Sequence, residues 1–278
     1  MSSHQFWQQF RYALQLGFAW MILGFLVLPM LIILPVSLTD RSYLSLPEHS
    51  LSIQHYQAFF SNSAWLSATG QSLLIASIAT ILALIIGSLC AIGCWRLSNG
   101  FSNGVRLFML APIIVPTIVQ GLAYYRFWAA TGLFDTYIGV IIAHTLVGLP
   151  YTIITVSASL AGFDVKLEQA ARSLGASTWR TLLHVIVPGI SPGLFAGGLF
   201  AFTHSFDELV IVLFITSRGI ATLPKRIWEG IEDNIDPTIA AAAVLLITIT
   251  FAVLLLGALF RSLSERASAR RNQLAEEH

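Results

Sequence analysis

Two adjacent carboxylates, Asp207 and Glu208, stand within an otherwise apolar run of the sequence. They lie about 16 residues, or about 24 Å of helix, beyond the start of a predicted membrane span at 192–216. A carboxylate in hydrocarbon costs several kcal/mol, so it usually faces a cavity, a partner or a cation on its path. Neighbouring helical residues point about 100° apart, so we expect at most one of the two to face such a path. The alternative is a structural role against a neighbouring helix or in the outer headgroup layer.

Aromatic side chains cluster in the stretch YYRFW, near the outer end of a predicted span at 106–128. Tyr124 and Trp128 are candidates to stack on an ammonium group along a substrate path. The alternative is an interfacial aromatic belt with Arg126 reaching the headgroups, and aromatics at the end of a span are typical of such a belt.

Catalytic signatures are missing from the sequence. The stretch GISPG at 189–193 matches the G-x-S-x-G pattern, but that pattern needs a strand–turn–helix elbow, and here Pro192 follows the serine with no strand before it. No H-E-x-x-H and no G-x-x-x-x-G-K-[ST] occurs. Cys90 and Cys94, one helical turn apart in an apolar run, are typical of buried core thiols. We therefore expect no catalytic residue, no metal site and no cofactor on this chain.

The composition requires a bilayer around much of the chain. Hydrophobic residues make up 56% and charged residues 10%, whereas soluble domains carry about 25% charged residues. A membrane helix needs about 20 apolar residues. The apolar runs predict an all-α integral membrane protein with six transmembrane helices, at 17–38, 70–95, 106–128, 136–160, 192–216 and 238–260. The first run is too long for a cleavable signal and no small-x-small site follows it, so we expect a retained anchor.

Lysine and arginine in the loops predict the orientation, because cytoplasmic loops carry an excess of them. With the N-terminus inside, ten lie inside and four outside. The inside set is Arg11, Arg96, Arg106, Lys166, Arg172, Arg180, Arg261, Arg266, Arg270 and Arg271; the outside set is Arg41, Arg218, Lys225 and Arg226. We expect both termini in the cytoplasm. The net charge of +1 gives no basic field for nucleic acid.

An amphipathic segment, VKLEQAARSLGASTWRTLLHVIVPGISPG at 165–193, interrupts the apolar runs on the inside. Its period of 3.6 predicts a first short helix that ends in a left-handed cap at Gly175. Ser177 is placed to cap a second helix, and Pro188 is expected to end it. The predicted apolar faces are Leu167, Ala171 and Leu174 on the first helix, and Trp179, Leu182, Leu183 and Ile186 on the second. Such a pair suits docking into another protein, and equally suits a helix lying on the headgroups.

This segment resembles the coupling loop of the integral membrane permease subunits of binding-protein-dependent ABC importers. In that family Glu-Ala-Ala is followed by three residues, Gly, nine residues and Ile-x-Leu-Pro. Here Gln169-Ala170-Ala171 precedes Gly175 by three residues, and nine more lead to Val185-Ile186-Val187-Pro188. Gln169 stands where the family prefers Glu, with Glu168 one position earlier.

The resemblance implies a MetI-like ABC type I importer permease fold. Its segments would be a cytoplasmic N-terminus (1–16), a first span (17–38), a periplasmic segment (39–69), a transmembrane domain (70–260) and a cytoplasmic tail (261–278). The coupling loop, residues 163–190, would dock in a cleft of an ATP-binding subunit. The implied contact residues are Glu168, Gln169, Ala170, Ala171, Gly175, Ala176, Ser177 and Pro188.

The resemblance also implies the partners: a second permease chain, two ATP-binding subunits that carry the ATP and Mg²⁺, and a periplasmic substrate-binding protein. The stretches APIIVPTIVQG (111–121), HTLVGLPYTIITVSASLAGFD (144–164) and SFDELVIVLFITSRGIATLPKRIWEGI (205–231) look like the spermidine/putrescine permeases of the bacterial inner membrane. Permeases for opines, aminoethylphosphonate, thiamine or ferric ion look similar, so those substrates stay open.

A self-sufficient secondary transporter is the alternative class of protein, and we find no internal repeat in the sequence that favours it.

Overall fold

The computed structural model describes residues 3–233 and 236–276 of the chain. Across these ranges the chain forms α-helices, one 3-10 turn and one π-helical turn, and no strand. The all-α prediction is confirmed. The chain divides into two compact units, Met1–Trp65 with Ile227–Ile247, and Leu66–Arg226 with Thr248–His278.

The first unit contains α1 (Ser3–Ser37) and α2 (Gln54–Ser61). The most apolar stretch of α1, within Arg11–Ser37, has no buried residue, whereas Ser37 at its end is buried. The loop between the two helices is held by polar contacts, since Ser37 Oγ lies 2.8 Å from Tyr56 Oη and Arg41 forms an ion pair with Glu48. Two further helices, α12 (Leu223–Asp233) and α13 (Thr238–Glu276), run through the boundaries between the units.

The second unit holds the remaining helices. They are α3 (Ser63–Leu97), α4 (Gly100–Leu110), η1 (Ala111–Ile113), α5 (Thr117–Thr131), α6 (Tyr137–Ala161), α7 (Val165–Ser173), α8 (Thr178–Thr181), η2 (Leu182–Ile186), α9 (Val187–Gly189), α10 (Ser191–Asp207) and α11 (Val210–Ile215). Most of α3 and the last part of α13 belong to this unit.

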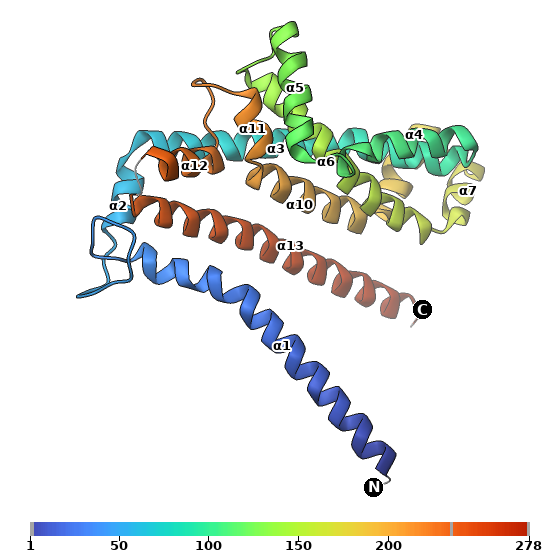
Figure 1. Ribbon diagram of the computed structural model, residues 1–278. Helices are drawn as coiled ribbons and strands as arrows, with labels where there is room; N and C mark the ends of the chain where they lie inside the picture. Colours follow the sequence, from blue (N-terminus) through green and yellow to red (C-terminus); the bar gives the residue numbers. More distant parts are fainter. Residues whose placement is uncertain (1–2, 234–235, 277–278) are drawn as a thin grey trace. The chain divides into compact units, whose positions relative to one another are not determined.

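Within the described residues, four helices are long and apolar enough to cross a bilayer, and two bent pairs bring the number to six if each pair is one span. The straight spans are Arg11–Ser37, Ser63–Leu97, Tyr137–Ala161 and Thr238–Leu259. The span predicted at 106–128 is not one continuous helix, because α4 with η1 meets α5 at 100° and the two pieces run in different directions (Figure 1). The prediction of one helix at 192–216 is also wrong, because α10 ends at Asp207 and α11 begins at Val210.

Small residues let α6 and α10 pack closely. A Cβ placed on Gly193 would lie 2.6 Å from the carbonyl oxygen of Thr155, and one on Gly197 would lie 2.6 Å from Thr155 Oγ1. The absence of side chains at Gly193 and Gly197 is therefore what allows α10 to approach α6 this closely. Gly189, four residues before Gly193, instead packs against the ring of Phe163.

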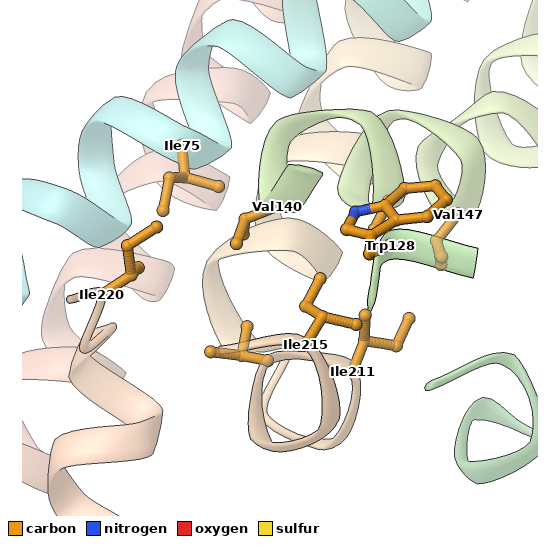
Figure 2. Packing of buried hydrophobic residues seen from close by; sticks show 9 residues of the cluster. Ile75, Trp128, Val140, Val147, Ile211, Ile215 and Ile220 are labelled. Carbon is orange, nitrogen blue, oxygen red and sulfur yellow. The ribbon is translucent and has the colours of Figure 1, made fainter. Parts of the chain in front are cut away.

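A buried apolar cluster fixes α5, α6 and α11 against one another and against α3. Figure 2 shows Trp128 from α5 beside Val147, with Ile211 and Ile215 of α11 packed close to them. The other members are Ile75, Val140, Ala143, Val212 and Ile220. This cluster sets the position of α11, which follows the break at Asp207 and Glu208.

Candidate functional site

The first helix of the coupling loop, α7, is capped at both ends. Asp164 caps its start, since its Oδ1 accepts the Lys166 N–H at 2.9 Å. At its end, Gly175 has φ +84° and donates its N–H to the Arg172 carbonyl at 2.9 Å, while the Ala176 N–H bonds to the Ala171 carbonyl at 3.0 Å. These two bonds form a Schellman motif. The predicted left-handed cap at Gly175 is confirmed, and the Asp164 cap, which the sequence analysis missed, has the usual signature of an Asp before an amphipathic run.

The second helix of the loop begins where predicted. Ser177 Oγ accepts the Arg180 N–H at 3.4 Å, which confirms Ser177 as the cap of α8. The prediction that Pro188 ends this helix is wrong, because α8, η2 and α9 continue one another to Gly189 and the turn comes at Ile190. The reason is the π-helical turn at Leu182–Ile186, whose wider winding admits a proline that lacks an N–H and would clash in a regular α-helix.

Only part of the predicted apolar face is available to a partner. Leu182 and Ile186 are buried in the chain's own core, in a cluster with residues of α3 and α6. Four large apolar side chains of the predicted face remain exposed, and we call them the docking patch: Leu167, Leu174, Trp179 and Leu183. Leu174 is 88% exposed, although it is the residue that adjoins the glycine cap.

Gln169 and Glu168, the two residues of α7 at and next to the family's Glu position, differ in their surroundings. Gln169 is exposed, whereas Glu168 is buried and forms ion pairs with Arg96 and Arg172. Ala170 is exposed and Ala171 half-buried. The sequence analysis missed Arg96, which lies 72 residues away at the end of α3.

The acidic pair lies at a helix break, and its two members do different things. Glu208 is 7% exposed, has an extended backbone (ψ 116°), and accepts the Ile211 N–H on Oε1 at 3.0 Å. It therefore caps α11. Asp207 is exposed, and the Thr250 hydroxyl donates to its Oδ1 at 3.4 Å. The Asp207 carboxylate is thus exposed on the chain, whereas the Glu208 carboxylate is engaged within it.

A second break, between η1 and α5, is held by a glutamine. Pro116 has no N–H, so the Pro112 carbonyl loses its helical partner. The Gln120 side-chain amide donates to that carbonyl and to the Val115 carbonyl, both at 2.8 Å. Beside this break is a mostly apolar cavity of about 280 Å³, lined by residues that include Gln120 and Tyr124.

The two candidate aromatic residues also differ. Trp128 is 5% exposed and belongs to the apolar cluster of Figure 2. Tyr124 is half-buried, with its ring centroid 5.3 Å from that of Trp128, and lines the cavity beside the break. The structure does not bring Tyr124 and Asp207 together in one pocket among those described.

A polar bridge links α6 to α10 just before the acidic pair. His144 Nδ1 lies 2.7 Å from Ser205 Oγ, and both side chains are buried. The ring of His204, the residue before Ser205, packs edge-on against Tyr151 at 5.1 Å. These contacts brace the end of α10.

The segment after α11 is organised by two charged side chains. Asp135, in the loop between α5 and α6, accepts the N–H groups of Ser217 at 2.9 Å and Gly219 at 3.0 Å. Partial burial acts to raise the pKa of Asp135, but these hydrogen bonds outweigh it and hold the pKa below its usual range. Lys225 is buried and donates to Thr216 Oγ1 at 2.8 Å and to the Ile220 carbonyl at 3.1 Å.

The apolar, partly bent helices and the capped amphipathic loop between them are those of a multi-span membrane protein. Residues 83–268 match the family described as "Binding-protein-dependent transport system inner membrane component", which covers more than half of the chain. The chain belongs to this family, and the resemblance of its loop to ABC importer permeases is confirmed. It is a transport component of the inner membrane.

Several curated relatives match over most of their length. The chain is 28% identical to the spermidine/putrescine transport system permease protein PotC of Haemophilus influenzae, over 90% of this chain and 96% of that protein. It is 30% identical to the putrescine transport system permease protein PotI of Escherichia coli (82% and 84%). It is also 30% identical to the trehalose transport system permease protein SugB of Mycobacterium tuberculosis (85% and 89%).

Solved structures share the fold. A bacterial ABC transporter involved in the import of the acidic polysaccharide alginate aligns with a TM-score of 0.70 at 14% identity, covering 94% of this chain and 99% of that chain. The same transporter in complex with its alginate pentasaccharide-bound periplasmic protein aligns with a TM-score of 0.69 at 16% identity, covering 90% and 92%.

Proposed function

We propose that this chain is the permease subunit of an ATP-driven importer that carries a polyamine, putrescine or spermidine, across the bacterial inner membrane. The observation that carries the proposal is the match with a spermidine/putrescine permease over 90% of the chain. An exposed carboxylate at a helix break, Asp207, supports a cationic substrate because it is placed to meet an ammonium group.

A disaccharide is the second candidate substrate, because a trehalose permease is 30% identical over 85% of the chain. A disaccharide would be carried by the same kind of importer, and because it is uncharged it would not need a carboxylate along its path. The opine, aminoethylphosphonate, thiamine and ferric-ion alternatives rest only on the resemblance of the sequence motifs.

The proposed complex contains a second permease chain, two ATP-binding subunits and a periplasmic binding protein, with both termini of this chain in the cytoplasm. ATP and Mg²⁺ would be held by the ATP-binding subunits. The exposed docking patch supports a protein contact at the coupling loop, since large apolar side chains there would otherwise face water. ATP binding would close the ATP-binding dimer, move the loop and open the substrate path outward.

Within the path, Asp207 is the proposed contact with the cation and Glu208 the residue that holds the break. Tyr124 remains a candidate because it lines a cavity. Trp128 is buried in the core, so its proposed contribution is to packing rather than to a direct substrate contact.

The test is uptake of radiolabelled putrescine and spermidine by membranes with matched subunit levels. Asp207→Asn removes the exposed charge, and a charge-assisted hydrogen bond is worth about 1.5–3 kcal/mol, or about 10- to 150-fold in binding. Glu208→Gln is the matched control. It loses one charge but keeps an oxygen for the Ile211 N–H, so we expect a much smaller effect.

Basal ATPase activity checks assembly of each variant. Near-normal polyamine uptake by Asp207→Asn, Glu208→Gln and the double variant would remove the acidic pair from the path. Trehalose uptake by the native complex, without polyamine uptake, would favour the disaccharide.

A further inference from the structure

The buried acid of the coupling loop is engaged inside the chain. Glu168 in α7 is 8% exposed, and its Oε1 lies 2.6 Å from Nη2 of Arg96, in the last turn of α3. Arg172, one turn further along α7, approaches the same oxygen at 3.3 Å. The arginine side chains are more exposed than the acid, at 28% for Arg96 and 49% for Arg172. One oxygen thus receives two guanidinium groups, and the contact with Arg96 is the shorter and less exposed.

A charge at this depth is stable only with its partner. Removing one member of a buried pair leaves the other charge uncompensated, which is why such deletions are strongly destabilising. Arginine remains charged at all accessible pH values, so Arg96 provides a permanent partner. Gln169, the next residue, is exposed and carries no charge, so the only carboxylate of α7 points into the chain rather than toward an external partner.

Arg96 connects the coupling loop to α3, a helix that does not adjoin the loop along the chain. Along the chain, α7 follows α6 directly, and α8, η2 and α9 lead directly into α10. Displacement of the coupling loop therefore reaches α6 and α10 through the backbone. The second half of the loop also packs against α3 through the cluster that contains Ala91, Leu182 and Ile186. For α7 itself, the Arg96–Glu168 pair supplies a charged attachment to the end of α3.

We propose that Glu168 is a positioning residue that fastens α7 to α3, so that displacement of the coupling loop moves α3 together with α6 and α10. This rests on the proposed function only in taking the loop as the part that the ATP-binding subunits displace. Glu168 then acts through Arg96 within the chain, and the partner contact is left to exposed residues such as Leu174 and Trp179.

The experiment uses the reconstituted complex with four variants: Glu168→Gln, Arg96→Gln, the double variant, and Arg106→Gln as the matched control. Arg106 is an arginine of α4 for which the described structure shows no ion pair. The first readout is amide hydrogen exchange of residues 165–174. The second is substrate taken up per ATP hydrolysed.

We expect both single variants to speed exchange of α7 about tenfold and to lower uptake per ATP about tenfold, as loss of a charge-assisted hydrogen bond predicts. The double variant should be no more than about twofold worse than the stronger single variant, because both remove the same interaction. Arg96→Lys should recover part of the coupling by restoring the charge, and Arg106→Gln should leave α7 exchange unchanged.

Several results would overturn the proposal. Unchanged α7 exchange in both single variants would show that the pair does not hold α7. Faster exchange with normal uptake per ATP would separate the pair from coupling, and effects that multiply in the double variant would mean that Glu168 and Arg96 act independently. If the native chain does not assemble with ATP-binding subunits, the proposed function fails, while exchange measured on the permease alone still decides whether the pair fastens α7.

Discussion

The turn at Gly175 offers a perturbation whose effect is confined to the backbone of the coupling loop. Gly175 has φ +84°, and a Cβ added there would meet no atom within 4 Å. Its N–H closes the end of α7 on the Arg172 carbonyl at 2.9 Å. A substitution therefore acts through the conformation and the hydrogen bond of this residue, not through a clash with neighbours.

The magnitude follows from these two observations. Gly175→Ala places an L-residue in the left-handed region, which costs about 1–2 kcal/mol and should loosen the turn. Gly175→Pro fixes φ near −65° and removes the N–H, so it cannot form this turn at all. Gly104→Ala is the matched control, because Gly104 lies within α4 with open space around it, where alanine should stabilise the helix by up to about 1 kcal/mol.

The assay is substrate-stimulated ATPase activity of the reconstituted complex, measured beside substrate binding by the periplasmic protein. Gly175→Ala should weaken stimulation, Gly175→Pro should abolish it, and Gly104→Ala should leave it unchanged. Substrate binding outside should persist in all three. Normal transport by a well-inserted Gly175→Pro complex would refute docking through an ordered loop.

Three further predictions concern topology, packing and pH. In a chain freed of Cys90 and Cys94, a cysteine at Ser177 should react with a membrane-impermeant reagent only from the cytoplasm and one at Ser61 only from outside; the reverse pattern would invert the topology drawn from the charge bias. Gly197→Leu should lower the melting temperature of the purified chain, because the new Cβ alone would lie 2.6 Å from Thr155 Oγ1 and overpacking costs about 1–3 kcal/mol. Gly93→Leu is the control, since a Cβ at Gly93 meets open space and should not lower the melting temperature. Equal melting temperatures for the two variants would contradict the close packing of α6 and α10. Asp135→Asn should lower the melting temperature at pH 7, because the pKa of Asp135 is depressed in the folded chain. The carboxylate therefore stabilises the fold above its unfolded pKa of about 3.9, and this stabilisation is lost as the pH falls through the folded pKa. The difference in melting temperature from the native chain should shrink below about pH 4, and no difference at pH 7 would contradict the role of Asp135 in holding residues 216–220.

Local features of the coupling loop were predictable from the sequence because caps depend on adjacent residues. Gly175 and Ser177 were identified correctly from their places beside amphipathic runs. The role of Pro188 was not predicted correctly, because its tolerance depends on a π-helical turn two to six residues earlier, and no residue type in that stretch specifies such a turn. The apolar face was predicted only in part, because periodicity does not distinguish Leu182, buried in the core, from Leu183, which is exposed.

Features that depend on distant residues could not be predicted. The break at Asp207 and Glu208 has no proline or glycine to mark it, and its cause is the Glu208 side chain that bonds the Ile211 N–H. Pro112 and Pro116 lie at the 100° bend between η1 and α5, but hydropathy does not reveal that the Gln120 side chain satisfies the carbonyls freed there. The Arg96–Glu168 pair joins residues that are 72 positions apart in the sequence. Hydropathy gives no indication that these two side chains are in contact.

The most direct test of the central claim is the complex of this chain with its permease partner, ATP-binding subunits and binding protein, reconstituted in proteoliposomes. ATPase stimulation and uptake would be measured across putrescine, spermidine, trehalose, an opine, aminoethylphosphonate, thiamine and ferric ion. We predict ATP-dependent uptake of a polyamine, with ATPase stimulation that requires the binding protein. Polyamine uptake that persists without the ATP-binding subunits, or stimulation by the other solutes with none by polyamines, would contradict the assignment.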